Sequence, residues 1–430
     1  MIKKIKQSKF LKNSMIYLSA DILNKAMPFL LLPILTTYLT PRDYGLISLF
    51  SIITGILTII IGLNLNGAIN ISYFKLRNKI LLSQYVGNAI ILLIIMTIII
   101  LFLAFLYSAL FSIKEIALPF LWIIIAIIVS LAQVIIRINL TLYQAEEKAK
   151  EYVSFEFIQV LINLILSLIL IVGYSLSWEG RLIAIATTSI VFANISLYIL
   201  FKYRKMIQLN IKQSYIKDML SYGIPLLPHS LAGWGKTSLD RLIIVHFLGL
   251  NELGIYTIAY QIASILNIIL VAFNRAWTPY LYARLNNISK ETKYILVKYT
   301  YIYFILVCFL YLFLSLFIDN IFEYFIDATY SSAIILVPII MSSFIFGGMY
   351  YMVGSYILYE KKTGVISKAT VSSTLLHLIL VYFSIQYYGL VGVAVSMVLS
   401  YFFNFIIVWY FSNQVFDMPW FKFNIKEDKL

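Results

Sequence analysis

Apolar segments of about 20 residues recur from one end of this chain to the other. A segment of that length, coiled as a helix, crosses the hydrocarbon core of a bilayer, which is about 30 Å thick. Hydrophobic residues make up 62% of the chain and charged residues 12%, whereas soluble domains are roughly 45 to 50% apolar and 25% charged. Because a soluble fold cannot bury so much apolar surface, the sequence predicts an all-α integral membrane protein.

About 12 transmembrane helices are expected. The first expected span follows a lysine-rich segment, but it is longer than the apolar core of a signal peptide and lacks a small-residue cleavage site, so we interpret it as a retained helix. The expected spans are residues 14–38, 44–72, 82–111, 116–138, 153–173, 180–201, 218–248, 254–281, 295–318, 331–358, 364–386 and 389–411.

The basic residues are concentrated in alternate connections between these spans. Of the 33 Lys and Arg residues, 25 lie in the two terminal segments and in every second connection. The other connections contain only Arg42, Lys114 and Arg181. Since cytoplasmic connections are enriched in Lys and Arg, the distribution predicts that both termini are cytoplasmic.

The net charge of +14 does not by itself indicate a nucleic-acid partner. The cations are scattered over connections, without the aromatic-interleaved groove or the modules that bind nucleic acid, so we assign them to topology and to anionic lipid. The single cysteine, Cys308, excludes an internal disulfide and a cysteine metal cluster. No phosphate-binding glycine loop or hydrolase motif occurs, so the sequence predicts no cofactor, no metal and no enzyme.

A short internal repeat relates residues 38–52 to residues 247–262, with Gly45 aligned to Gly254. Both copies join the first and second spans of a six-span half. An even number of spans separates them, so two six-helix halves related as parallel repeats are expected, with substrate between the halves. The expected organisation is an N-terminal half at 1–201, a cytoplasmic linker at 202–217, a C-terminal half at 218–411 and a cytoplasmic tail at 412–430.

The first and seventh spans contain helix-breaking residues at corresponding places. Pro28 and Pro33 lie in the first span, and Gly223, Pro225 and Pro228 lie in the seventh. Proline removes an amide donor and kinks a helix, and paired breaks in the two halves of a transporter mark the transport site. The alternative is that these prolines are among those common in membrane helices generally.

Three cations lie within the same two spans: Lys25, Lys236 and Arg241. A charge at the bilayer centre costs about 2.5 to 3.5 kcal/mol, so three unpaired cations would cost roughly 8 to 10 kcal/mol. They are therefore the first candidates for binding an anionic substrate. Asp21 and Asp240 lie four residues from the two lysines and are candidate ion-coupling carboxylates. The alternative is that Asp21 with Lys25 and Lys236 with Asp240 are structural ion pairs.

Further candidates have weaker support. Arg275 and Arg137 lie near the ends of their spans, where snorkelling to the interface would also explain them. Asn64 and Asn66 place amides in the second span. Amides bind sugar hydroxyls, but they also join helices to one another in membranes.

Several segments carry a resemblance to a known family. Residues 17–45, YLSADILNKAMPFLLLPILTTYLTPRDYG, resemble the opening of Wzx-type polysaccharide flippases of the multidrug/oligosaccharidyl-lipid/polysaccharide (MOP) exporter superfamily. The second half agrees through YGIPLLP at 222–228, SLDR at 238–241, residues 248–256 and WTPY at 277–280. The resemblance covers essentially the whole chain.

The resemblance implies a MATE-like fold in the bacterial inner membrane. It implies a flippase that moves undecaprenyl-pyrophosphate-linked oligosaccharide repeat units to the periplasmic leaflet by alternating access, for O-antigen, capsule or exopolysaccharide synthesis. The polysaccharide polymerase and chain-length machinery would be partners, beside the lipid-linked oligosaccharide and membrane lipid.

Two alternatives remain. A cation-coupled multidrug exporter of the same superfamily would favour acidic cavity residues, whereas the central charges here are three cations and two carboxylates. A membrane-bound sugar polymerase or ligase would need a sizeable outward loop, and the outward connections are short.

Overall fold

The computed structural model describes residues 29, 31–76, 78–110, 117–285, 289–360 and 362–420, without the side chains of three residues, Lys236, Thr237 and Thr363. Over these ranges the structure consists of helices and connections, with no β-strand. The predicted all-α architecture is therefore confirmed. Its described residues form two compact units that meet in sequence between Ser238 and Leu239.

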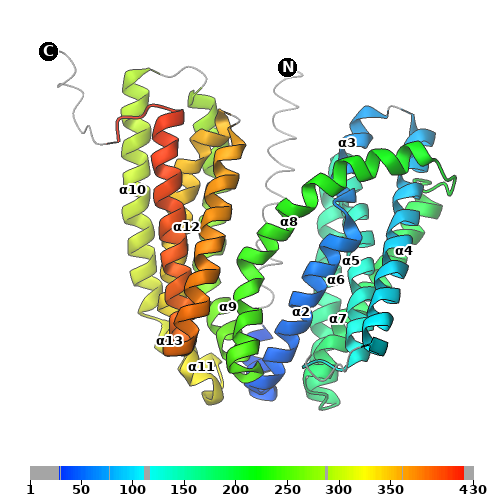
Figure 1. Ribbon diagram of the computed structural model, residues 1–430, viewed down its shortest axis with the longest axis horizontal. Coiled ribbons are helices and arrows are strands. Elements are labelled where there is room, and N and C mark those ends of the chain that lie inside the picture. The colour runs from blue at the N-terminus through cyan, green and yellow to red at the C-terminus, as the bar shows by residue number, and fades with distance from the viewer. Residues whose placement is uncertain are drawn as a thin grey trace. The chain divides into compact units, whose positions relative to one another are not determined.

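The first unit begins with a helical segment at residues 31–38. Its helices are α2 (Pro41–Gly62), α3 (Leu65–Lys75), α4 (Lys79–Leu110), α5 (Phe120–Ala145), α6 (Ala149–Leu168), α7 (Trp178–Tyr198) and the greater part of α8 (Gln213–Leu248) (Figure 1). Short turns of π-helix extend α6 and α7, at Ile169–Gly173 and Ile199–Tyr203.

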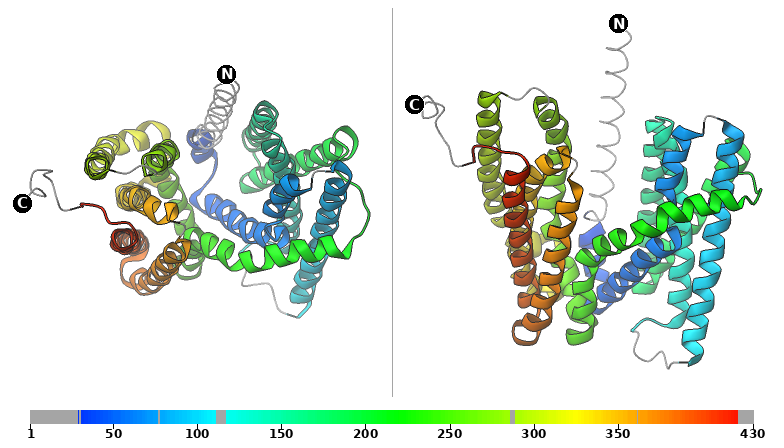
Figure 2. Two further views of the ribbon diagram at one scale, coloured as in Figure 1. Left: turned by 90° about the horizontal axis from the view of Figure 1, so that it is seen from above. Right: turned by 45° about the horizontal axis from the view of Figure 1, so that its top comes forward.

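The second unit takes the end of α8 and the helices that follow. The helices are α9 (Leu250–Leu285), α10 (Lys290–Ser315), α11 (Ile318–Phe325), α12 (Leu336–Tyr359) and α13 (Thr363–Val415). A short 3-10 helix, Ala328–Ala333, lies directly before helix α12. Within this unit α12 packs against α9, α10 and α13, and the long helices are seen nearly end-on in the left view of Figure 2.

Nine helices in the described ranges are long and apolar enough to cross a membrane. One of them, α13, contains two expected spans, because Gly389 adopts a φ of 55° and the chain folds back there. Helix α8 is not among the nine, and most of the first expected span lies outside the described residues. The multi-span helical fold is thus confirmed, whereas the number of twelve spans stays a prediction.

A capping box begins α2 and explains the Thr-Pro-Arg-Asp sequence of the predicted repeat. The Asp43 carboxylate accepts a hydrogen bond from the Thr40 amide at 2.9 Å, and the Asp43 amide donates to the Thr40 hydroxyl at 3.3 Å. The second copy also begins a helix, since α9 follows Gly249 (φ 89°) and carries Glu252 in its first turn. The relation between the two halves remains a prediction.

The backbone break in the first unit lies in the second expected span. Leu63 and Asn64 both adopt left-handed conformations, with φ of 44° and 53°, and they separate α2 from α3. Helix α8 continues through Pro225 and Pro228 of the seventh expected span, and the kink expected at these prolines stays a prediction. The Asn64 side chain holds the break in place, because its Oδ1 accepts a hydrogen bond from the Ser230 hydroxyl of α8 at 3.0 Å.

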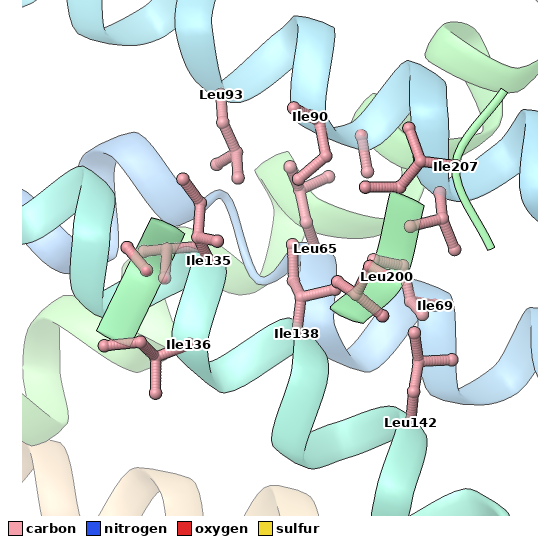
Figure 3. Packing of buried hydrophobic residues seen from close by; sticks show 14 of the residues in the cluster. Leu65, Ile69, Ile90, Leu93, Ile135, Ile136, Ile138, Leu142, Leu200 and Ile207 are labelled. Carbon is pink, nitrogen blue, oxygen red and sulfur yellow. The ribbon is translucent and has the colours of Figure 1, made fainter. Parts of the chain in front are cut away.

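Helix α5 lies at the centre of the first unit and contacts α2, α3, α4, α6 and α7. Its side chains Ile135 and Ile138 meet Leu65 of α3 and Leu93 of α4 in a cluster of buried aliphatic residues (Figure 3). Leu200, in the π-helical extension of α7, belongs to the same cluster. The cluster includes Leu142 and Leu200, which lie close in sequence to the polar residues Glu146 and Arg204.

The segment expected to be a linker, 202–217, packs onto α4. The Asn88 amide donates to the carbonyl of Asn210 and accepts from the amide of Lys212, at 2.8 and 2.9 Å. The following part of α8 also packs against the first unit, where a Cβ on Gly223 would lie 2.1 Å from the Leu63 carbonyl oxygen. These contacts join residues 202–217 and the start of α8 to the first unit, and the division into two six-helix halves stays a prediction.

Glu146, in the turn between α5 and α6, connects this turn to the end of α7. Its carboxylate lies 2.8 Å from Lys148 Nζ and 2.6 Å from Arg204 Nη2, and the Arg204 guanidinium stacks 4.6 Å from the Tyr143 ring centre. Burial raises the pKa of Glu146, but the hydrogen bonds and charges of Lys148 and Arg204 together hold it below the ordinary value of 4.5. The carboxylate is therefore more acidic in the folded protein.

We expect this cluster to contribute its full stability above about pH 4.5, the ordinary glutamate value, and to lose it at lower pH. A group with a lowered folded-state pKa contributes stability above its unfolded pKa and loses it as pH falls through the folded pKa. Glu146→Gln should therefore lower the melting temperature at pH 7 and flatten its decrease between about pH 5 and pH 3. Glu360→Gln, at an exposed position, should leave both unchanged in the same thermal scans, and equal pH profiles for all three proteins would refute the assignment.

Candidate functional site

The carboxylate of Asp240 is buried at the start of the second unit, with 4% of the residue exposed. Its Oδ2 accepts a hydrogen bond from the Tyr256 hydroxyl of α9 at 2.8 Å, and its Oδ1 accepts from the Arg241 amide at 2.8 Å. The Tyr256 hydroxyl also lies 3.9 Å from Met397 Sδ of α13. The side chain of Lys236, the partner considered from sequence, lies outside the described residues.

Arg241 lies against an aromatic wall formed by α9, α12 and α13. Its guanidinium carbon is 4.7 Å from the centre of the Tyr260 ring, a cation–π distance. Behind Tyr260, the ring of Phe344 is 5.8 Å away, and Tyr401 packs on Phe344 at 6.2 Å. In the described structure Arg241 Nε is buried without a hydrogen-bond acceptor. A cation with unused donors therefore lies beside several aromatic faces.

A second polar site lies within the first unit, between α5, α6 and α7. Arg181 Nη1 donates to Asn163 Oδ1 at 2.7 Å and to the Ser167 hydroxyl. Arg181 lines a pocket of about 260 Å³ together with Gln133, Gln159 and Thr188. This pocket carries a positive charge and several neutral hydrogen-bonding groups.

The described residues that the sequence singled out belong to both units. Asp240 and Arg241 lie together in the second unit, and Asn64 lies at the α2–α3 break in the first unit, where Asn66 is half-buried. Arg137 of α5 and Arg275 of α9 are exposed. The remaining candidates, Asp21, Lys25 and the side chain of Lys236, lie outside the described residues.

Arg181 was missed because the sequence analysis assigned it to a connection. It lies instead in the first turn of α7, and its side chain contacts α6. Three polar residues of α6, Gln159, Asn163 and Ser167, are spaced by four in an otherwise apolar span, which places them on one helix face. That stripe was the available signal for a buried polar site.

Solved structures of membrane transporters share this fold. An inward-facing multidrug resistance MATE family transporter of the MOP superfamily matches with a TM-score of 0.71 and 17% identity, over 91% of this chain and 94% of that chain. A MOP superfamily transporter from Pyrococcus furiosus Vc1, described as having a binding pocket of reverse polarity that suggests a different function, matches with a TM-score of 0.60 and 18% identity, over 95% and 94% of the two chains. The chain therefore has the fold of these MOP superfamily transporters.

Comparison with known sequences identifies the family. The family described as "Polysaccharide biosynthesis protein" matches residues 10–285. A protein of the Lsg locus of Haemophilus influenzae is 26% identical over 378 residues, 86% of this chain and 90% of that protein. An uncharacterized membrane protein of the same organism is 27% identical over 294 residues, 66% of this chain and 68% of that protein.

The chain belongs to this polysaccharide biosynthesis family, the polysaccharide flippases of the MOP superfamily. Its long apolar helices make it a multi-pass membrane protein, with the fold of MOP superfamily transporters. The resemblance noted in the sequence and the MATE-like fold that it implied are both confirmed.

Proposed function

We propose that the protein flips undecaprenyl-pyrophosphate-linked oligosaccharide repeat units across the bacterial inner membrane, for the synthesis of a surface polysaccharide. Both termini would be cytoplasmic, and the substrate would enter from the cytoplasmic leaflet. The polymerase and chain-length machinery would take up the flipped product. Membership of the polysaccharide biosynthesis family supports this function over the multidrug exporter considered from sequence.

Arg241 beside Tyr260 is the observation that carries the proposal. A lipid-linked pyrophosphate has about two negative charges, which must be compensated inside the membrane. Guanidinium groups bind phosphate oxygens through paired N–H donors, and stacking on an aromatic ring holds the guanidinium in one orientation. Because Arg241 Nε is buried without a hydrogen-bond acceptor among the described residues, it can donate to a phosphate oxygen without first breaking an internal contact.

The aromatic wall next to Arg241 suits the sugar part of the same substrate. Tyr260, Phe344 and Tyr401 present ring faces and edges, and ligand sites combine such apolar surfaces with a few polar groups that fix orientation. Asn64 and Asn66 in the first unit would supply amides for sugar hydroxyls, with Lys25, Lys236, Arg137 and Arg275 as further candidate cations. These additional roles rest on the sequence.

Energy for the transport step would come from an ion gradient. Asp240 is the candidate coupling carboxylate among the described residues, since it is buried and held by the Tyr256 hydroxyl. Protonation of Asp240 would remove its charge and turn one of its oxygens from an acceptor into a donor. That change would alter the bond to Tyr256 and the backbone next to Arg241, and so couple ion binding to the substrate site. Asp21 remains the candidate from the first span.

Transport by purified full-length protein in proteoliposomes tests this function. The substrate is a short oligosaccharide with a fluorescent label, linked through pyrophosphate to a polyprenol, and a membrane-impermeant reductant reports the fraction in the outer leaflet. We expect protein-dependent flipping of this lipid and none of a polyprenyl glycoside that lacks the pyrophosphate. Active export of drug-like cations with no flipping of the lipid would contradict the proposal and favour a multidrug exporter.

A further inference from the structure

The pocket around Arg181 in the first unit contains a charge that the described structure does not neutralise. The Arg181 guanidinium lies against the amide of Asn163 and the hydroxyl of Ser167, which are both neutral. Among the described residues it forms no ion pair. Glu179, the carboxylate nearest in sequence, is exposed. A cation among apolar helices without a counter-charge is costly, so the pocket is suited to an anion.

The donors of Arg181 are only partly used. Both of its hydrogen bonds come from Nη1, and a guanidinium has five N–H groups. Nε and Nη2 therefore have about three N–H groups for a ligand. Because Arg181 lines the pocket of about 260 Å³, a bound anion can reach these groups without entering the packed core.

Thr188 gives a second and independent indication of a ligand. Only 3% of the residue is exposed, and its hydroxyl, which belongs to the lining of the pocket, has no hydrogen-bond partner in the described structure. A buried hydroxyl without a partner costs about 1 to 3 kcal/mol, so such groups are almost always satisfied by protein, water or a ligand. A hydroxyl can donate to an anion.

The other lining groups favour a small anion as well. Gln133 and Gln159 project amides from α5 and α6, and the Oε1 of Gln133 already accepts a weak hydrogen bond of 3.4 Å from Thr58. The amide nitrogen of Gln133 is then the group left to donate into the pocket. The described lining includes one cation, several potential donors and no carboxylate.

We propose that this pocket of the first unit binds a small monovalent anion, with chloride as the abundant physiological ligand. Arg181 supplies the charge, and the Thr188 hydroxyl and the glutamine amides supply further donors. The volume of about 260 Å³ accommodates the ion together with water molecules. The site is contained in the first unit, and its existence does not depend on the substrate proposed above.

The thermal stability of the full chain in detergent tests the site without any transport assay. Sodium gluconate, whose anion is large, is replaced stepwise by sodium chloride at constant ionic strength. A ligand that binds the folded state raises the melting temperature; the rise should be about 3 °C at about ten times the dissociation constant and should grow with the logarithm of the chloride concentration above that. Equal melting temperatures in the two salts over the whole series would overturn the proposal.

Two substitutions assign the response to the pocket. Arg181→Gln should abolish the chloride response, whereas Arg42→Gln, which removes an exposed cation of α2, should preserve it. Asn163→Asp places a carboxylate where the amide oxygen lies 2.7 Å from Arg181 Nη1, so the protein would carry its own anion. This variant should be as stable in gluconate as the native protein is in chloride, and should not respond to chloride. A full chloride response in either pocket variant would refute the site, and Asn163→Asp decides the matter if Arg181→Gln does not fold.

Discussion

Arg241→Ala is expected to lower the initial rate of lipid-pyrophosphate oligosaccharide flipping by about 30- to 700-fold. The substitution removes the cation that stacks on Tyr260 and leaves the substrate pyrophosphate uncompensated in a site of low dielectric constant. Loss of one member of a buried charge pair costs about 2 to 4 kcal/mol, and each 1.4 kcal/mol corresponds to about a factor of ten in rate or affinity. The proteoliposome assay with the labelled pyrophosphate lipid measures the change directly.

The matched control is a second arginine that stacks on a tyrosine. Arg284, at the end of α9, lies 4.6 Å from the Tyr280 ring centre and is exposed, so Arg284→Ala removes the same chemistry outside the site and should flip at the native rate. Arg241→Lys keeps the charge without the planar fork and should have an intermediate rate. Native flipping by Arg241→Ala, at equal amounts of reconstituted protein, would contradict the role of Arg241.

The positions of the helices could be predicted from the sequence because they depend on local properties. Apolar length locates a membrane helix, and glycine locates a sharp turn between two of them. The expected spans at 364–386 and 389–411 are the two arms of α13, and the chain turns at Gly389 between them. The capping box at Thr40 is likewise visible in the four residues that form it.

The break at Leu63 and Asn64 could not be predicted in this way. Both residues lie in an apolar segment that reads as one span, and their left-handed conformations are stabilised by contacts that come from far along the chain. The Ser230 hydroxyl of α8 satisfies Asn64, and Gly223 of α8 allows the helix to approach the Leu63 carbonyl. Tertiary packing, rather than a local sequence rule, decides the position of this break.

The charged sites were predicted in part, for a related reason. Hydropathy gives the cost of inserting a charge, and this cost drew attention to Asp240 and Arg241 in the seventh span. It does not give every partner of a charge: the Asp240 carboxylate accepts a hydrogen bond from Tyr256, sixteen residues further along the chain. Arg181 near a helix end carried no evident insertion cost, so its contact with Asn163 of α6 could be found only from the fold.

Gly223→Ala is expected to destabilise the first unit strongly, because α8 crosses the α2–α3 break at this residue. An added Cβ would lie 2.1 Å from the carbonyl oxygen of Leu63 and 3.1 Å from its carbon, so two backbones would have to separate. Separation would also stretch the bond between Ser230 and Asn64, now 3.0 Å. Overpacking of this kind costs about 3 kcal/mol, which corresponds to a decrease of about 6 to 12 °C in melting temperature.

The same helix provides the control. An added Cβ on Gly233 of α8 would have no described atom within 4 Å, and alanine is favoured over glycine within a helix by about 1 kcal/mol. Gly233→Ala should therefore leave the melting temperature in detergent unchanged or raise it by about 2 to 4 °C, whereas Gly223→Ala should lower it. If the two substitutions shift the melting temperature equally, general helix propensity rather than the close crossing at Leu63 determines the effect, and the packing of α8 on the break does not stabilise the unit.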